Sequence, residues 1–165
     1  MTEGRRVTRA LLWLIALGAV ASAAAQQRWT TYADPRFGTT IDYPADLFVQ
    51  RDPPPDNGDG QAFRSRDGRA RLAVWGAYNV DGESPQDYVE QYVKPDGGIT
   101  YRQVTARYFA VSGLRKGDIF YQRCNFAAAP GDVIDCFEVT YPPADKAAMD
   151  AVVARLSRSL RSGSR

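Results

Sequence analysis

The sequence predicts an α+β domain in which an antiparallel sheet is flanked by helices. Many short segments, rich in aromatic and β-branched residues, follow one another with only brief turns of proline, glycine and aspartate between them. Two segments with helical periodicity stand apart from these, one in the middle of the chain and one near its end. Successive strands with separated helices are typical of an α+β sandwich.

The first half of the chain begins with two expected strands. Residues 29–32 predict a short strand, and Asp34 opens a turn before a second strand at residues 37–43, which Pro44 ends. Residues 52–60 contain three consecutive prolines and alternating glycines. Because prolines remove backbone donors and glycines favour turns, this stretch is expected to be a surface loop.

A hairpin and the first helix follow. Residues 62–65 and 70–78 predict two strands joined at Asp67-Gly68, a strong signal for a two-residue turn. Ser84 then has the character of a helix N-cap, with Pro85 at the first helical position. The apolar residues that recur at helical spacing before the turn at 95–98 are Tyr88, Val89, Tyr92 and Val93.

The second half predicts four strands and a closing helix. The strands are expected at residues 99–106, 108–112, 118–126 and 133–141, with a turn over 113–117. The closing helix is expected to begin at Pro143 or Ala144 and to end in a basic turn. Its apolar stripe is Met149, Val152, Val153, Leu156 and Leu160.

The N-terminal segment has the pattern of a secretory signal peptide. Three arginines precede an apolar run at residues 11–20, and small residues at 21–25 fit a cleavage site after Ala25. A membrane anchor is the alternative, but a span needs about 20 apolar residues and this run ends in the cleavage pattern. We therefore expect export to the periplasm or secretion, and no membrane span in the chain that starts at Gln26.

Removing residues 1–25 also changes the charge. The segment holds three arginines but only Glu3, so the 21 basic and 19 acidic residues of the whole chain become 18 of each. A neutral chain lacks the basic footprint that binding to a phosphate backbone requires, so no nucleic acid is expected as a partner. Residues 26–161 fit a single globular domain, and residues 162–165 are expected to form a disordered tail.

The chain has two cysteines, Cys124 and Cys136. If the last hairpin is centred on Pro130, the two lie directly opposite each other and can form a disulfide, as expected in an oxidising compartment. A metal or redox centre is the alternative, but the sequence has no Cys-x-x-Cys and no histidine.

The residue inventory excludes much familiar catalysis. Without histidine the chain has no His-based acid or base, no Ser-His or Cys-His pair and no imidazole metal ligand, and it contains no phosphate-binding or dinucleotide-binding glycine motif. We expect no cofactor and no metal. A carboxylate pair could still act, as in glycosidases, and the candidates are Asp42, Asp46, Glu83, Glu90 and Glu138.

Four arginines gather on the hairpin around Asp67-Gly68. With a two-residue turn, Arg64 faces Arg71 and Arg66 faces Arg69, and Trp75 shares their face by strand alternation. A solvated edge that protects against aggregation is one interpretation. An anion-binding patch is the other, because arginine forks suit carboxylate, phosphate and sulfate groups.

The order of motifs resembles the PsbP-like family. The resemblance rests on Trp29-x-x-Tyr32, on Arg36-Phe37-Gly38-x-x-Ile41-x-Tyr43-Pro44 and on the closing helix that ends in 156–161. More closely, the chain resembles uncharacterised exported proteins of proteobacteria with the same start and the same hairpin from Phe120-Tyr121 to Cys136-Phe137-Glu138. The resemblance implies an α/β/α sandwich and a role in binding or assembly. Relatives of the family include a Ran-GTPase-binding nuclear import factor.

These observations predict an exported, non-catalytic binding or accessory protein. The expected partner is a protein, an envelope polymer or a small anion. The alternative is a carboxylate-dependent hydrolase acting on envelope glycan, and the sequence leaves enzymatic activity open. Metal binding described for PsbP-type proteins uses histidine, so no functional residue of that family can be carried over to this chain.

Overall fold

A computed structural model describes residues 27–127 and 133–163 of the chain. The expected signal peptide at 1–25 and the hairpin tip at Pro130 lie outside these residues. Within the described ranges the elements are β1 (Trp29–Ala33), β2 (Thr40–Pro44), β3 (Gln50–Arg51), β4 (Gly60–Arg64), β5 (Arg71–Tyr78), α1 (Pro85–Tyr92), β6 (Ile99–Val104), β7 (Tyr108–Arg115), β8 (Asp118–Phe126), β9 (Val133–Tyr141), the 3₁₀ turn η1 (Pro143–Asp145) and α2 (Lys146–Ser159).

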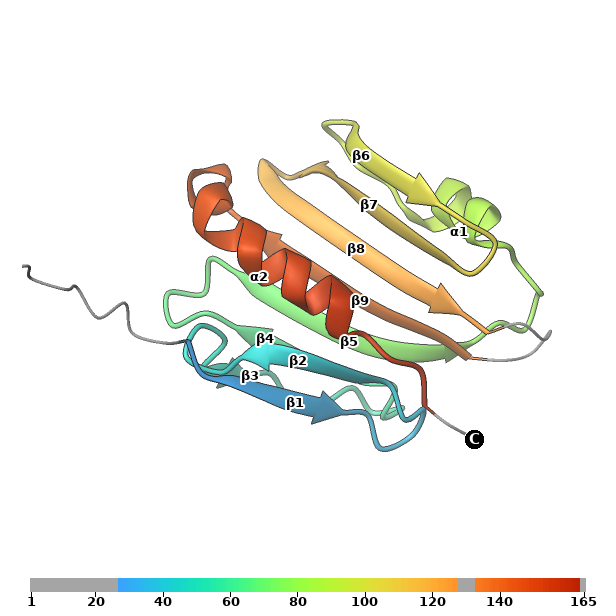
Figure 1. The fold of residues 1–165 in the computed structure, drawn as a ribbon, viewed down its shortest axis with the longest axis horizontal. Coiled ribbons are helices and arrows are strands. Elements are labelled where there is room, and N and C mark those ends of the chain that lie inside the picture. The colour runs from blue at the N-terminus through green and yellow to red at the C-terminus, as the bar shows by residue number, and fades with distance from the viewer. Residues whose placement is uncertain (1–26, 128–132, 164–165) are drawn as a thin grey trace, which may run out of the picture.

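A seven-stranded antiparallel sheet dominates the fold. Its strand order is β3-β4-β5-β9-β8-β7-β6, and β1 pairs with β2 in a separate two-stranded sheet (Figure 1). Strand β9, the last in the chain, lies at the centre between β5 and β8. The predicted α+β class, with an antiparallel sheet between helices, is confirmed.

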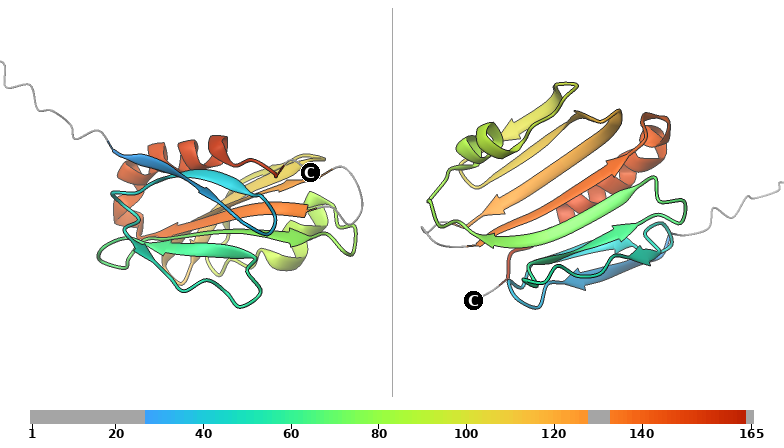
Figure 2. Two further views of the ribbon diagram at one scale, coloured as in Figure 1. Left: turned by 90° about the horizontal axis from the view of Figure 1, so that it is seen from below. Right: turned by 180° about the vertical axis from the view of Figure 1, so that it is seen from behind.

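Helices cover both faces of this main sheet. Figure 2, in its left view, shows α2 and the β1–β2 hairpin on one side and α1 on the other. We call these sides the α2 face and the α1 face. Since neighbouring residues of a strand point to opposite faces, each central strand must supply two separate cores.

The larger core lies on the α2 face. Leu72 and Val74 of β5 pair with Val139 and Phe137 of β9, and all four are buried against α2. Leu156 of α2 is fully buried in the same cluster. The apolar stripe predicted for the closing helix is confirmed, because Met149, Val152, Val153 and Leu156 are its buried residues.

The smaller core lies on the α1 face. Val89 of α1 packs with Phe109 of β7, Phe120 of β8 and the buried cysteines of β8 and β9. Tyr88 stacks on Phe109 with ring centroids 5.5 Å apart. A helix of eight residues thus covers part of this face, on the side of the outer strands β7 and β6 (Figure 2).

Strand β2 begins three residues later than predicted. Asp34 accepts hydrogen bonds from the backbone N–H groups of Arg36 and Phe37, and Gly38 has a φ of 75°. Asp34 thereby holds residues 34–38 in a turn, a role for which aspartate is suited because its side chain bonds nearby backbone donors. Phe37, expected in the strand, instead packs edge-on against Tyr78.

Two further differences concern strand lengths. Strand β7 continues to Arg115, and the turn before β8 is only Lys116 and Gly117, both at positive φ. Two successive residues at positive φ are typical of a tight hairpin turn, so the expected five-residue turn was too long. The two-residue strand β3 was not predicted.

The start of α1 follows the sequence signals closely, whereas α2 begins at Lys146, after a 3₁₀ turn over Pro143–Asp145, and so two to three residues later than expected. Ser84 accepts a hydrogen bond from the N–H of Asp87, whose carboxylate reaches back to Ser84 in a capping box.

Near the end of the described chain, Arg161 forms a backbone bridge with Thr40 of β2, and Gly163 lies against Gly38. Residues 164–165 of the expected tail lie outside the described residues.

Candidate functional site

An apolar groove runs beside α2 on the α2 face. One side of the helix forms its first wall, and the exposed ends of β6 to β8 form its floor and second wall, enclosing about 820 Å³. The helix contributes residues from Lys146 to Arg158, a rise of about 18 Å. We call this feature the apolar groove; its lining is Thr100, Tyr101, Ser112, Gly113, Leu114, Ile119, Tyr121, Tyr141, Lys146, Asp150, Val153, Ala154, Ser157 and Arg158.

Stacked aromatic rings form part of the groove floor. Tyr121 of β8 lies between Tyr101 of β6 and Phe137 of β9, with ring centroids 6.4 Å and 5.8 Å away. The Tyr121 hydroxyl is 3.0 Å from the Ser157 Oγ of α2, which ties the floor to the helix wall. Burial raises the pKa of Tyr121, so this hydroxyl stays protonated. Tyr101, by contrast, is 46% exposed at the outer wall.

A second hollow, which we call the polar pocket, lies on the α1 face. It encloses about 400 Å³ between the sheet and α1. Glu138 of β9 and Gln122 of β8 are directly opposed on its floor. The other lining residues are Arg71, Ala73 and Trp75 of β5, Tyr88 and Tyr92 of α1, Lys94 beyond α1, and Arg115 of β7.

The polar pocket contains more positive than negative charge. The Nη1 of Arg115 donates to Glu138 at 2.7 Å, with both side chains mostly buried. The guanidinium of Arg115 also lies 4.3 Å from the centre of the Phe120 ring. Arg71 and Lys94 add two further cations to the lining, and the carboxylate of Asp52 outside the lining lies 3.8 Å from Arg71.

The structure places three of the four arginines of the predicted anion patch, Arg64, Arg69 and Arg71, beside carboxylates. The register pairs Arg64 with Arg71, as expected, and the Nε of Arg64 donates to Asp52 at 2.8 Å. Asp52 also lies 3.8 Å from the Nε of Arg71. This hydrogen bond from Arg64 holds the pKa of Asp52 below its usual range.

The turn of the same hairpin is held by its own aspartate. Asp67 accepts hydrogen bonds from the Ser65 hydroxyl and the Arg69 Nε, which lower the pKa of Asp67. Arg69 further approaches Asp145 at 3.6 Å. Arg66 is exposed and forms no ion pair with a described residue. The predicted two-residue turn is wrong: the Ser65 N–H donates to the Ala70 carbonyl and the Gly68 N–H donates to the Ser65 carbonyl, so residues 66–69 form a longer connection in which Arg66 and Arg69 are not paired across strands. Anion binding by the four arginines stays a prediction.

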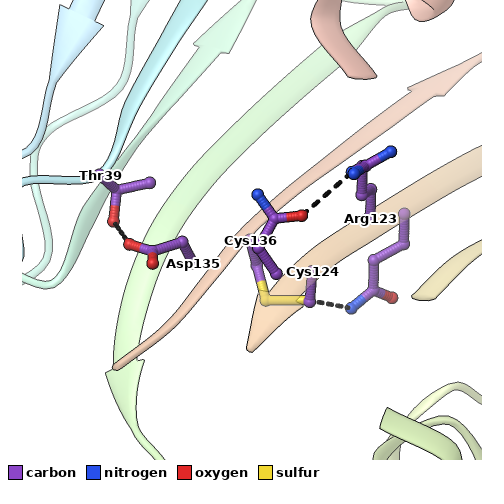
Figure 3. Close-up of a disulfide and its surroundings, with 7 residues drawn as sticks. Thr39, Arg123, Cys124, Asp135 and Cys136 are labelled. Atoms are coloured by element: carbon purple, nitrogen blue, oxygen red, sulfur yellow. Dashed lines mark hydrogen bonds between the residues drawn. A yellow bond between two sulfur atoms is a disulfide. The ribbon is translucent and has the colours of Figure 1, made fainter. Parts of the chain in front are cut away.

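The cysteines form a disulfide between the two central strands. The β8–β9 register pairs Cys124 with Cys136, their Cα atoms lie 4.1 Å apart, and both side chains are fully buried (Figure 3). The predicted pairing in the hairpin register is confirmed. Because Trp75 of β5 pairs with Cys136, the disulfide lies directly beside the polar pocket.

The carboxylates considered for catalysis are distributed over separate elements. Asp42 pairs with Arg155, Glu90 with Arg102, and Glu138 with Arg115. Asp46 forms an ion pair with Arg28. Glu83 accepts a hydrogen bond from the hydroxyl of Tyr92, and this bond raises the pKa of that tyrosine. Each is thus placed next to a partner of its own, in contrast to the two convergent carboxylates of a glycosidase.

Sequence reasoning missed both hollows. For the polar pocket one signal was present, since strand alternation placed Arg71 and Trp75 on one face, as the structure confirms. The opposed Gln122 and Glu138 could have been read from the same hairpin register that paired the cysteines. The apolar groove had no comparable signal, because it depends on where α2 lies on the sheet.

Metal clusters and membrane spans are both absent from the described residues. Among residues 27–127 and 133–163, no three of the metal-binding residue types lie together. In the same part of the chain, neither helix combines the length and the apolar character needed to cross a bilayer.

Comparisons with known proteins define the fold class. No protein family matched the sequence, and no curated protein did. Among solved structures, the solution structure of cyanobacterial PsbP (CyanoP) from Synechocystis sp. PCC 6803 matches with a TM-score of 0.54 at 11% identity, over 88% of this chain and 98% of that chain. The Ran-binding protein Mog1p of Saccharomyces cerevisiae matches with a TM-score of 0.55 at 10% identity, over 82% of this chain and 96% of that chain.

These matches span nearly the whole of both neighbours. At such low identity they show the fold alone, and that fold is the PsbP-like α+β sandwich. The fold expected from the resemblance is therefore confirmed.

Proposed function

We propose that this is an exported, non-catalytic accessory protein whose apolar groove holds a short apolar segment of a partner protein. The observation that carries the proposal is the groove itself. It offers about 820 Å³ lined by tyrosine, leucine, isoleucine, valine and alanine side chains, next to the outer strand β6 of the sheet. Apolar surface left open in this way, rimmed by polar residues, is typical of interaction sites.

The aromatic outer wall suits a protein ligand. Tyr101 of β6 is 46% exposed at this wall, and Ile99, on the same strand but outside the groove lining, is 36% exposed. Tyrosine is enriched in protein interfaces because its ring buries apolar area while its hydroxyl remains hydrogen-bonded. Mog1p, which has a similar fold, is a Ran-binding protein, and this supports protein binding as a use of the fold.

The charges at the groove specify the partner segment further. Lys146 and Asp150 neutralise each other at 2.8 Å near one end of the helix wall. Arg158, at the other end, has no ion-pair partner among the described residues. An acidic residue placed at one end of the bound segment would pair with Arg158 and fix its direction.

Export is supported by the disulfide. A buried disulfide persists in oxidising compartments such as the periplasm, and the signal-peptide pattern at residues 1–25 would deliver the chain there. We propose the periplasm or the extracellular space as the location, as in the exported proteobacterial proteins that the sequence resembles. The alternative of a carboxylate-dependent hydrolase of envelope glycan gains no support from the separate placement of the five carboxylates.

The experiment compares two lysine substitutions on the same helix. Ala154 lines the apolar groove, whereas Ala151 is exposed on α2 outside it. Lysine is a good helix former, so both Ala154→Lys and Ala151→Lys should leave α2 intact, but only the first places a charge in the groove. Affinity capture from periplasmic extract is run with wild type and both variants.

We expect a protein that is recovered with wild type and with Ala151→Lys but lost with Ala154→Lys. A peptide made from the recovered protein should bind wild type at least about tenfold more tightly than Ala154→Lys. Recovery of the same proteins by both variants would contradict the groove as the binding site.

Sequencing of the N-terminus of the exported protein should find Gln26 first, and an intact N-terminus would contradict cleavage.

A further inference from the structure

The polar pocket on the α1 face has no role in the proposed function. It lies on the opposite side of the sheet from the apolar groove, and its lining is charged where that of the groove is apolar. Three basic side chains, Arg71, Lys94 and Arg115, line it together with the carboxylate of Glu138, and Asp52 outside the lining lies 3.8 Å from Arg71, which leaves an excess of one positive charge. A concentration of positive charge around a partly enclosed space favours an anionic ligand.

Gln122 presents an amide with few protein partners to this pocket. The residue is only 6% exposed, and its amide can take part in four hydrogen bonds. In the described structure its Nε2 has one contact, 3.8 Å from the Cys124 Sγ, and its Oε1 makes no hydrogen bond with a described residue. The amide is not fully sealed from solvent and faces the pocket, so polar groups of a ligand would replace water as its hydrogen-bond partners.

The neighbouring side chains indicate what kind of ligand could provide those groups. Gln122 needs both a donor and an acceptor, and Glu138 beside it can accept a further hydrogen bond. Hydroxyl groups donate and accept at once, whereas a plain aromatic acid would cover the amide without bonding it. Trp75 and Tyr92 offer ring surface to the less polar side of the ligand.

We infer that the polar pocket binds a small hydroxylated organic anion, of which a hexuronate is the simplest example. Its carboxylate lies between Arg71 and Lys94, and its hydroxyl groups meet Gln122 and Glu138. Arg115 is held by Glu138 at 2.7 Å and keeps that carboxylate in position at the floor. This site is distinct from the predicted arginine patch, with which it shares only Arg71.

The first test measures ligand class directly at the pocket. Trp75 lines it, so the indole N–H resonance of Trp75 in a ¹⁵N-labelled sample reports binding. Titrations use galacturonate, galactose and benzoate, which provide charge with hydroxyls, hydroxyls alone and charge alone. We expect galacturonate to shift this resonance saturably and to bind about tenfold more tightly than the other two.

Each other outcome overturns the inference. Equal binding of benzoate would contradict the role of the hydroxyl groups, and equal binding of galactose would contradict the role of the cations. No shift with millimolar galacturonate would show that the pocket is not a site for this class of ligand.

The second test uses matched arginine and lysine variants. Lys94→Gln removes an exposed cation that belongs to the polar pocket but not to the arginine patch, and should weaken galacturonate binding about tenfold. Arg66→Gln removes a cation that belongs to the patch alone and should leave binding unchanged. The reverse result would assign the anion to the arginine patch and overturn the inference.

Gln122→Met tests the buried amide itself. Methionine is similar in length and flexible, so it should fill the same space without hydrogen-bonding groups. We expect galacturonate to bind about tenfold more weakly, while benzoate, which makes no use of the amide, is unaffected. If Gln122→Met fails to fold, the Lys94→Gln and Arg66→Gln pair still decides the question. The partner capture described above is independent of all three variants, so the two proposals can fail separately.

Discussion

The two faces of the main sheet are covered by very different amounts of structure. On the α2 face, a helix of fourteen residues and the β1–β2 hairpin enclose the larger core. On the α1 face, a helix of eight residues lies over a core that contains the disulfide. The α2 face is stabilised mainly by the burial of many apolar side chains. The α1 face has a smaller apolar core and a disulfide.

This difference explains where each hollow lies. Helix α2 lies over β9 and beside β8, while β7 and β6 lie farther out to one side of it (Figure 1), so apolar surface of β6 to β8 stays open as the groove. Under α1, the cover is too short to seal the sheet, and polar residues such as Gln122 and Glu138 occupy the space beside the disulfide. The apolar groove is therefore lined largely by apolar side chains, and the polar pocket largely by polar and charged ones.

The largest expected effect concerns the apolar anchors of the two helices. Leu156 of α2 is fully buried and Val89 of α1 is 2% exposed. Leu156→Ala should lower the free energy of unfolding by about 4 kcal/mol, because it leaves a cavity in the larger core. Val89→Ala removes less apolar volume and should lower it by about 2 kcal/mol. Urea denaturation measures both changes.

Amide hydrogen exchange sharpens the same comparison. If α1 is a local unit, Val89→Ala should speed exchange mainly within 85–93 while the strands remain protected. Leu156→Ala should speed exchange across α2 and the central strands together. Uniform acceleration in both variants would show that the two covers unfold as one unit.

The disulfide should contribute nearly as much as a core leucine. Cys124 and Cys136 are separated by 12 positions, and closing so short a loop in the unfolded chain stabilises the fold by about 3 kcal/mol in the entropy model. The double variant Cys124→Ala/Cys136→Ala should lose that amount. It should also bind galacturonate more weakly, because the link lies beside Gln122. A loss below about 1 kcal/mol would contradict the importance of the covalent link on this face.

Local sequence signals were enough for most of the fold. The register of the β4–β5 hairpin is as predicted, with Arg64 facing Arg71 and Phe63 facing Leu72, although residues 66–69 connect the strands in place of a two-residue turn. The same kind of reasoning placed Cys124 opposite Cys136. Register within a hairpin is determined by its turn and by strand alternation, both of which are visible in the sequence.

The candidate sites depend on contacts that are distant in the chain. The polar pocket exists because β5 pairs with β9, which brings Trp75 beside Cys136, and because α1 lies on that face. Nothing local to Trp75 or Cys136 indicates that these strands are neighbours. Likewise, the ion pairs of Arg64 with Asp52 and of Arg69 with Asp145 join elements whose proximity only the tertiary fold determines.

The smallest expected effect compares the first turns of the two helices. In α1, Ser84 and Asp87 form a reciprocal capping box. In α2, the corresponding residue Asp145 makes no side-chain capping bond and approaches Arg69 at 3.6 Å with both side chains well exposed. Ser84→Ala should therefore lower the free energy of unfolding by about 1 kcal/mol.

Asp145→Ala should lower it by about 0.5 kcal/mol or less, because exposed ion pairs contribute little. Thermal and urea unfolding of both variants measure the difference, and exchange of the amides at 85–88 shows whether the loss in Ser84→Ala is confined to α1. A short helix lacks the burial that makes a missing cap tolerable in a long one. Equal losses in the two variants would mean that α1 and α2 depend on their first turns alike, and that the contrast between the two faces lies only in their cores.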